Sequence, residues 1–370
     1  VMRDSWKKEK LDDLISNYLD FRGKTPLKLG MNWGGGDIRA LSANNVSKGK
    51  VDFEKECYYA SEALYKKWMN KGDCEKGDVL LTMEAPLGNV AQIPDDKKYI
   101  LSQRTILLKF KKTKVNKDFM FHLLSSEEFQ RKLIKHSTGS TVTGIQQKKL
   151  SKLEVCYPRL TDQRKIASIL STCDEVIEKT EAAIAKYQAL KQGMMHDLFT
   201  RGIDVKTGKL RPSYQDSPEL YKESDLGMIP KDWEVNELGN LTKLVTDGSH
   251  FSPIPQEKGM PIGNVKDMLD STFNYDGCTK IIPEVFELLT RQNCSPKKGD
   301  VLLSKDGTVG KVIHFEDEQQ IVLLSSIAII RVNELIESAY LAWALRSEIF
   351  DKALYSLLSG SALKRITLKD

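Results

Sequence analysis

The hexamer KGDVLL occurs at residues 76–81 and again at residues 298–303, 222 positions later. Its surroundings repeat in the same order, which a chance hexamer match would not produce. The helix-like segment 119–129 aligns with 340–350 at an offset of 221, and a Trp-Leu-Leu pattern at 6–14 recurs at 233–241. A period this long exceeds that of any solenoid repeat. The sequence therefore predicts the tandem duplication of a whole domain.

Each copy alternates apolar strand-like runs with helix-like stretches, which predicts a mixed α/β (α+β) fold. The chain has 370 residues and 40% apolar content, enough for each copy to bury its own core. We expect four parts: a first domain at 1–157, a spacer helix at 158–200, a linker at 201–230 and a second domain at 231–370.

The expected spacer contains no proline from residue 161 to 199 and a single glycine, Gly193. Its apolar residues recur at the a and d positions of a heptad, with Thr180 and Lys191 as interruptions, which indicates a coiled-coil helix. We expect Thr161 or Asp162 to cap it, and about 38 residues to span roughly 57 Å. A long amphipathic helix lying on the core of one domain is the alternative. The predicted seam consists of Ile166, Leu170, Cys173, Ile177, Ile184, Tyr187, Met194 and Leu198.

Charge and cysteine content restrict the class of protein only loosely. The formal net charge of +5 permits a polyanionic partner. The six cysteines form no CxxC pair and no metal-ligand spacing with histidine, which is typical of reduced thiols and predicts no metal site. No apolar run approaches the roughly 18 to 20 residues that span a bilayer, and the first residues lack a hydrophobic signal region. We therefore expect a cytoplasmic protein.

Catalytic motifs are poorly matched. The two glycines of GTVGKV (307–312) stand three apart, and Val312 replaces the Ser or Thr of a phosphate loop. Asp300 and Lys305 suggest a nuclease-like pair, but the first copy has Met83 where the second has Lys305. The sequence therefore predicts a binding protein that is not an enzyme. A scaffold or adaptor that binds proteins through duplicated domains is the alternative.

Two similar domains suit a ligand with two similar sites, and duplex DNA is such a ligand because phosphate contacts fix the register and groove contacts read bases. The loop DFRGKTP (20–26) corresponds to DGSHFSP (247–253): the shared Asp and Pro suggest one frame, and the differing residues could read different bases. The loop HSTGSTVTG (136–144) corresponds to LLSGSALKR (357–365), whose hydroxyls could hold phosphates. A turn without a ligand is the alternative for each loop. The predicted DNA-binding residues are Asp20, Arg22, Gly23, Lys24, Thr25, Ser137, Thr138, Ser140, Thr141, Lys148, Asp247, Gly248, Ser249, His250, Ser252, Lys305, Ser359, Ser361, Lys364 and Arg365.

These motifs, together with PRLTDQRKIASIL, DLFTRGI, LGMIPKDWEV and TDGSH, appear in one order along the chain. The chain thereby resembles the specificity subunit of Type I restriction-modification systems over essentially its whole length. The resemblance implies two target recognition domains, each reading half of a split DNA site, and an antiparallel coiled coil that sets the spacing. It also implies two modification (methyltransferase) subunits and restriction/translocase subunits as partners. S-adenosylmethionine, ATP and magnesium would then act in those partners, and this chain would hold no cofactor.

One feature departs from the family pattern. The second copy ends at Asp370, where the equivalent of the spacer helix would begin. We therefore expect the second spacer helix to be absent from this chain, through truncation or in a natural short form whose seam another chain fills. Asp162 stands where the family usually has Glu, and we expect no functional consequence.

Overall fold

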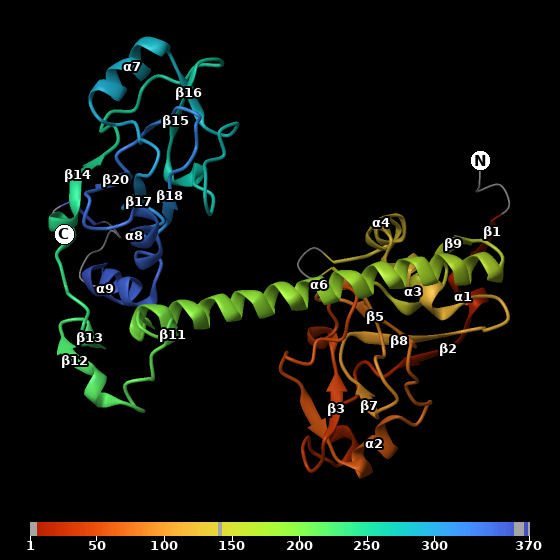
Figure 1. Cartoon of the computed structure of the whole chain (residues 1–370). Coiled ribbons are helices and arrows are strands. Elements are labelled where there is room, and N and C mark those ends of the chain that lie inside the picture. The colour runs from red at the N-terminus through yellow and green to blue at the C-terminus, as the bar shows by residue number, and fades with distance from the viewer. Residues whose placement is uncertain (1–5, 140–142, 359–365, 369–370) are drawn as a thin grey trace. The chain divides into compact units, whose positions relative to one another are not determined.

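The computed structural model describes residues 6–139, 143–358 and 366–368. The chain forms two compact units, Val1–Ala183 and Ile184–Asp370, and the boundary between them falls inside the long helix α6 (Leu160–Thr200). In Figure 1 the colour runs along the chain from red in unit 1 to blue in unit 2.

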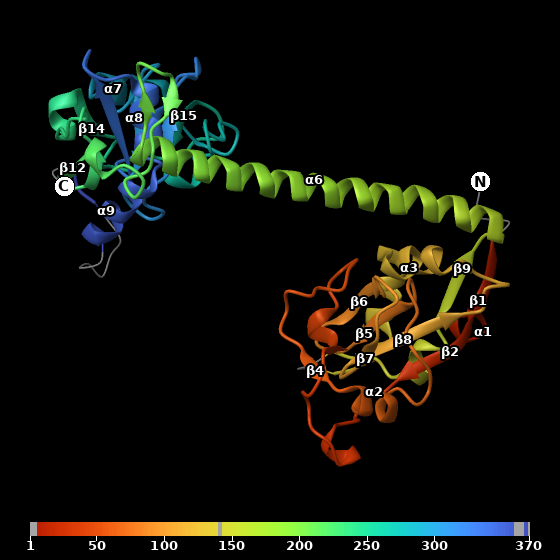
Figure 2. The same ribbon diagram turned by 60° about the horizontal axis from the view of Figure 1, so that its bottom comes forward.

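Unit 1 is a mixed α/β domain built on a four-stranded sheet of order β2-β8-β5-β6 and a three-stranded sheet of order β4-β3-β7. In both views α3 and the first part of α6 lie on the same side of this domain as the short β1-β9 ladder (Figures 1 and 2). Its elements are β1 (Lys7–Lys10), α1 (Leu11–Leu14), β2 (Ile15–Asp20), β3 (Ile38–Leu41), β4 (Tyr58–Ala60), α2 (Glu62–Trp68), β5 (Val79–Met83), β6 (Leu87–Gln92), β7 (Tyr99–Leu101), β8 (Thr105–Phe110), α3 (Lys117–Ser125), α4 (Glu127–Lys135), α5 (Gln147–Leu150), β9 (Glu154–Tyr157) and the start of α6.

The strand of the first KGDVLL motif, β5, is apolar at consecutive positions because both of its faces are covered. Side chains alternate between the two faces of a strand. Val79 and Leu81 enter the core that includes residues of α3 and α4, whereas Leu80 enters the core that includes α2 and the three-stranded sheet. All three side chains have no exposed surface. The repeated hexamer is therefore part of the scaffold.

Unit 2 has the same strand orders, β14-β20-β17-β18 and β16-β15-β19. Its elements are the end of α6, β10 (Ile203–Asp204), β11 (Lys209–Leu210), β12 (Tyr221–Ser224), β13 (Gly227–Pro230), β14 (Thr242–Asp247), β15 (Met260–Gly263), β16 (Thr279–Ile281), α7 (Pro283–Arg291), β17 (Val301–Ser304), β18 (Val312–His314), β19 (Val322–Leu323), β20 (Ile327–Val332), α8 (Ser338–Ala344) and α9 (Glu348–Leu358).

The strand registers of the two units correspond at the offsets that the sequence predicts. Val79 faces Leu108 in unit 1, and Val301 faces Ile330 in unit 2, so both strands are displaced by 222. Asp20 faces Ile106 and Asp247 faces Ala328, which places the two Asp-containing loops at the same edge of their sheets. Each unit also has a capping box at the same point, Ser42 with Asn45 and Asn264 with Asp267.

Helix α6 lies within the predicted range 158–200, but it is not capped as expected. It begins at Leu160, so Thr161 and Asp162 are already inside its first turn. Its beginning is fixed instead by Gln163, which has no exposed surface. The Gln163 amide accepts from the backbone of Asn116 (2.8 Å) and donates to the carbonyl of Pro158 (2.8 Å).

The predicted linker at 201–230 is more ordered than its composition suggests. It forms two small antiparallel hairpins, β10 with β11 and β12 with β13. Arg211 is buried and pairs with Asp232 at 2.6 Å. Gly202 has φ +64°, and a Cβ there would lie 2.4 Å from the ring of Trp233. Only glycine fits this chain reversal after α6.

Candidate DNA interface

The first predicted contact loop, in unit 1, uses its charges to hold its own shape. Arg22 forms a two-pronged pair with Asp20, with its Nη2 2.6 Å from Oδ2. Burial alone would raise the pKa of Asp20, but the hydrogen bonds from Arg22 outweigh it and the pKa lies below its ordinary value. The Lys24 ammonium donates to the carbonyl of Trp68 at 2.6 Å. Thr25, another of the predicted DNA-binding residues, is partly exposed next to these contacts. Gly23, with φ +77°, makes the turn of the loop.

The equivalent loop in unit 2 is held by a buried ion pair. Lys305 is 3% exposed, and its ammonium lies 3.3 Å from Asp247, which also contacts His250 at 3.1 Å. A Cβ at Gly248 would lie 2.1 Å from the carbonyl oxygen of Leu323, so a larger residue cannot replace this glycine. DNA contact by Lys305 stays a prediction, and it requires this pair to open. Of the predicted contact residues in this loop, His250 and Ser252 are exposed and Ser249 is buried; Phe251, between them, is also exposed.

The second predicted loop follows α4. Thr138 and Gly144 exchange two backbone hydrogen bonds of 2.8 and 3.0 Å, which close the loop at its base. The Ser137 hydroxyl donates to the carbonyl of Ile134, and Lys148 is exposed on α5. The other predicted members of this set lie outside the described residues: Ser140, Thr141, Ser359, Ser361, Lys364 and Arg365.

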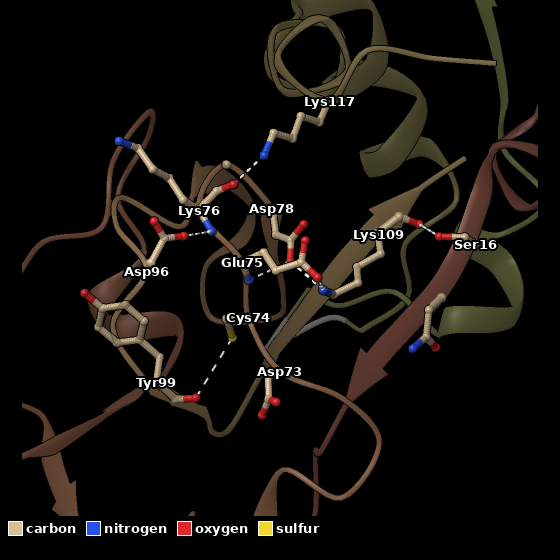
Figure 3. Close-up of polar contacts among 12 residues, drawn as sticks. Ser16, Asp73, Cys74, Glu75, Lys76, Asp78, Asp96, Tyr99, Lys109 and Lys117 are labelled. Carbon is tan, nitrogen blue, oxygen red and sulfur yellow. Dashed lines mark hydrogen bonds and ion pairs between the residues drawn. The ribbon is translucent and has the colours of Figure 1, made fainter. Parts of the chain in front are cut away.

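The nuclease-like pair of the sequence does not come together. Asp300 precedes β17 and Lys305 follows it, so the strand separates them. Asp300 accepts from Arg331 at 2.8 and 2.7 Å. Asp78 has the equivalent place in unit 1 and lies 3.1 Å from the Lys109 ammonium (Figure 3). Each KGD aspartate therefore anchors its turn to the neighbouring strand.

Sequence reasoning missed a hollow of about 600 Å³ next to the first loop of unit 1. One wall is aromatic: Trp33 stacks on Tyr58 with ring centroids 5.2 Å apart and planes 8° apart, and its ring also lies 5.2 Å from that of the buried Trp68. Tyr58 is held in place by this stack and is nevertheless 62% exposed. The remaining lining is mostly polar and includes Thr25, Asn32, Ser42, Asn44, Ser102 and Gln103.

A second hollow of about 410 Å³ shares Ser42, Asn44 and Gln103 with the first and continues to Arg104. The two hollows therefore adjoin at these three residues, and we call them together the unit 1 hollow. Amide and hydroxyl groups are the donors and acceptors that read base edges. No sequence pattern marks these residues, because they lie in separate loops before β3, after β3 and after β7, which only the fold brings together.

The exposed face of α6 is broader than the predicted seam. Ile166 packs against the core of unit 1, whereas the other predicted seam residues are exposed or nearly so: Leu170, Cys173, Ile177, Ile184, Tyr187, Met194 and Leu198. The heptad assignment missed Ile169, Val176 and Leu190, each more than half exposed beside the seam. An exposed apolar stripe of this width is typical of a surface that binds another helix or protein.

Metal and membrane features can be judged only for the described ranges. Within residues 6–139, 143–358 and 366–368, His, Cys, Asp and Glu side chains form no group of three placed to bind a metal ion. Over the same ranges no helix has the length and hydrophobicity needed to cross a bilayer.

Comparison with known proteins identifies the family. Residues 3–186 match the family described as the Type I restriction modification DNA specificity domain. The type I restriction enzyme MjaVIII specificity subunit of Methanocaldococcus jannaschii is 28% identical over 303 residues, which are 77% of this chain and 64% of that protein. The MjaIX specificity subunit of the same archaeon is 31% identical over 170 residues, 46% of this chain and 36% of that protein.

The crystal structure of a Type-I restriction-modification system S subunit from M. genitalium has a TM-score of 0.58 at 16% identity, covering 98% of this chain and 82% of that one, which shows a shared fold. Residues 3–186 of this chain belong to the family of Type I restriction-modification DNA specificity domains. It spans less than two thirds of the length of either curated relative.

Proposed function

We propose that this chain is a non-catalytic specificity subunit that binds a bipartite duplex DNA site and holds the other subunits of a Type I restriction-modification complex. The observation that supports this most directly is the repetition of one sheet topology in the two units, with different side chains in their equivalent loops. One frame used twice with different contact residues suits two short, unlike half-sites. The names of the relatives point to the same role.

The same proposal assigns a part to each segment. Residues 1–157 and 231–370 are the target recognition domains, descended from one duplicated domain, 158–200 is the spacer helix and 201–230 is the linker. The exposed stripe on α6 supports a pairing role for that helix. The partners would be two modification (methyltransferase) subunits and restriction/translocase subunits, which would use S-adenosylmethionine, ATP and magnesium in the cytoplasm.

Selection from a randomised duplex library, with the modification subunits present, tests this function. The expected result is two short motifs separated by a fixed, unspecified gap. A single contiguous motif, or no enrichment at all, would contradict the proposal.

Salt distinguishes DNA binding from the alternative of a protein-binding adaptor. Six phosphate contacts would lower DNA affinity roughly a thousandfold between about 50 and 200 mM salt, because counterions are released on binding. An affinity that does not change over that range would favour the adaptor.

A further inference from the structure

The two units allow an internal comparison of scaffold and surface. Several equivalent positions keep the same chemistry. Asp78 pairs with Lys109 and Asp300 pairs with Arg331. Both units also retain a capping box directly after the equivalent strands β3 and β15. These residues are partly or fully buried and hold turns in place, so equal chemistry is expected of them.

The positions that line the unit 1 hollow behave differently. Leu101 faces Leu41 in the same register as Leu323 faces Gly263, so Gln103 corresponds to Ser325 and Arg104 corresponds to Ser326. The residue two after each cap is Asn44 in unit 1 and Lys266 in unit 2.

The aromatic wall also changes between the units. Tyr58 faces Ala40 as Thr279 faces Ile262, so the exposed Tyr58 ring corresponds to a Thr. The same backbone arrangement therefore carries different side chains at these exposed positions in unit 1 and in unit 2.

The amides of the hollow are available for an external ligand. Asn44 is exposed and donates through Nδ2 to the carbonyl of Glu56 at 3.3 Å, which leaves its side-chain oxygen as an acceptor. Within the described residues, the exposed side chain of Gln103 makes no hydrogen bond. Arg104 lies at the rim and approaches Glu84 only at 3.7 Å, with both side chains about half exposed. Such a solvated pair is weak and easily exchanged for a phosphate.

We propose that the unit 1 hollow reads base edges of one DNA half-site, with Gln103 and Asn44 as its specificity-determining residues, and that Ser325 and Lys266 take this role in unit 2. The proposal rests on the proposed DNA-binding function. An Asn or Gln amide matches the donor and acceptor of adenine in the major groove, so adenine is the expected base. The rigid Tyr58 ring would bound the hollow on its aromatic side.

The test is library selection with the full chain and its modification subunits, comparing the wild type with Gln103→Ser. The substitution is the residue type that stands at position 325 in the same backbone frame, so folding should be unaffected. We expect discrimination at one or two positions of a single half-site to fall roughly 5- to 150-fold. The gap and the other half-site should not change.

Two control variants make the result specific. Lys266→Asn should alter only the half-site that Gln103→Ser leaves intact. Gln292→Ser, the same chemical change at the exposed end of α7, should alter neither. Unchanged preferences in both half-sites of Gln103→Ser would overturn the assignment, provided that the wild type selects a bipartite motif. A wild type that selects none would overturn the proposed function itself.

Discussion

The buried aspartate of the second KGD motif offers a quantitative test of the scaffold role. Asp300 is 1% exposed and accepts three hydrogen bonds, two from Arg331 and one from the backbone of Lys297 at 2.7 Å. The hydrogen bond with Asp300 raises the pKa of Arg331, so the guanidinium is firmly charged. Replacing Asp300 by Asn keeps an acceptor for the Lys297 amide but removes the negative charge from beside Arg331.

The size of the effect follows from how much water reaches the pair. Removing one partner of a fully buried ion pair costs about 3 to 5 kcal/mol. The Arg331 side chain is 26% exposed, and water can solvate part of the charge that is left. We therefore expect Asp300→Asn to lower the free energy of unfolding of unit 2 by about 2 to 3 kcal/mol, scaled down from that range.

Asp78→Asn is the matched control in unit 1. Lys109 meets Asp78 through a single ammonium contact and shares it with Glu75, which is largely exposed. Because Glu75 still pairs with the Lys109 ammonium after this change, the loss of the single contact should cost about 1 kcal/mol.

Thermal unfolding followed by hydrogen exchange, read separately on peptides of β17 and of β5, measures both variants. For a unit of this size, the loss in Asp300→Asn corresponds to a melting temperature roughly 4 to 12 °C lower. Equal shifts in the two variants, or a loss below about 0.5 kcal/mol in Asp300→Asn, would refute the argument from burial and two-pronged geometry.

Two further predictions concern α6 and pH. Inserting seven residues after Glu181 adds roughly 10 Å of helix without changing its face much, so library selection should return both half-site motifs unchanged with a longer gap; altered motifs would contradict a spacer role. Burial lowers the pKa of His122 below its ordinary value of 6.5, against the smaller raising effect of Asp174. The folded unit 1 therefore favours the neutral ring, and this part of its stability is present above pH 6.5 and is lost as the pH falls below that value. His122→Gln should lose less stability than the wild type between about pH 7 and 5 in denaturant unfolding, and equal losses would show that His122 is not responsible.

The repeat made much of the architecture predictable. The offset of 222 between the two KGDVLL motifs also relates the strand pairings of the two units. Val79 faces Leu108 and Val301 faces Ile330, a correspondence that the sequence alone could not show. The long helix was predictable because proline is absent over its whole length. The seam was predicted only in part, because a strict a and d assignment omits Ile169, Val176 and Leu190, which widen the apolar face.

Local hydrogen bonds account for what the sequence did not reveal. The stretch 119–129 reads as one helix, yet Ser126 ends α3 and caps α4 with its own side chain. Ser347 accepts from Phe350 at the equivalent place. The unit 1 hollow was not predictable because its residues come from separate loops, and the burial of Lys305 is likewise invisible in the sequence.

The two capping boxes show how this fold can change its amino acids and keep the same backbone geometry. Ser42 with Asn45, and Asn264 with Asp267, close the same turn with no residue in common. This turn requires a side-chain oxygen at its first position and another side-chain oxygen three residues later. Of the two side chains between them, the first is buried (Ala43 and Val265), whereas the second is exposed and differs between the units (Asn44 and Lys266). Mutation or recombination can thus rewrite one exposed surface at little risk to folding, so this surface can diverge faster than the backbone that carries it.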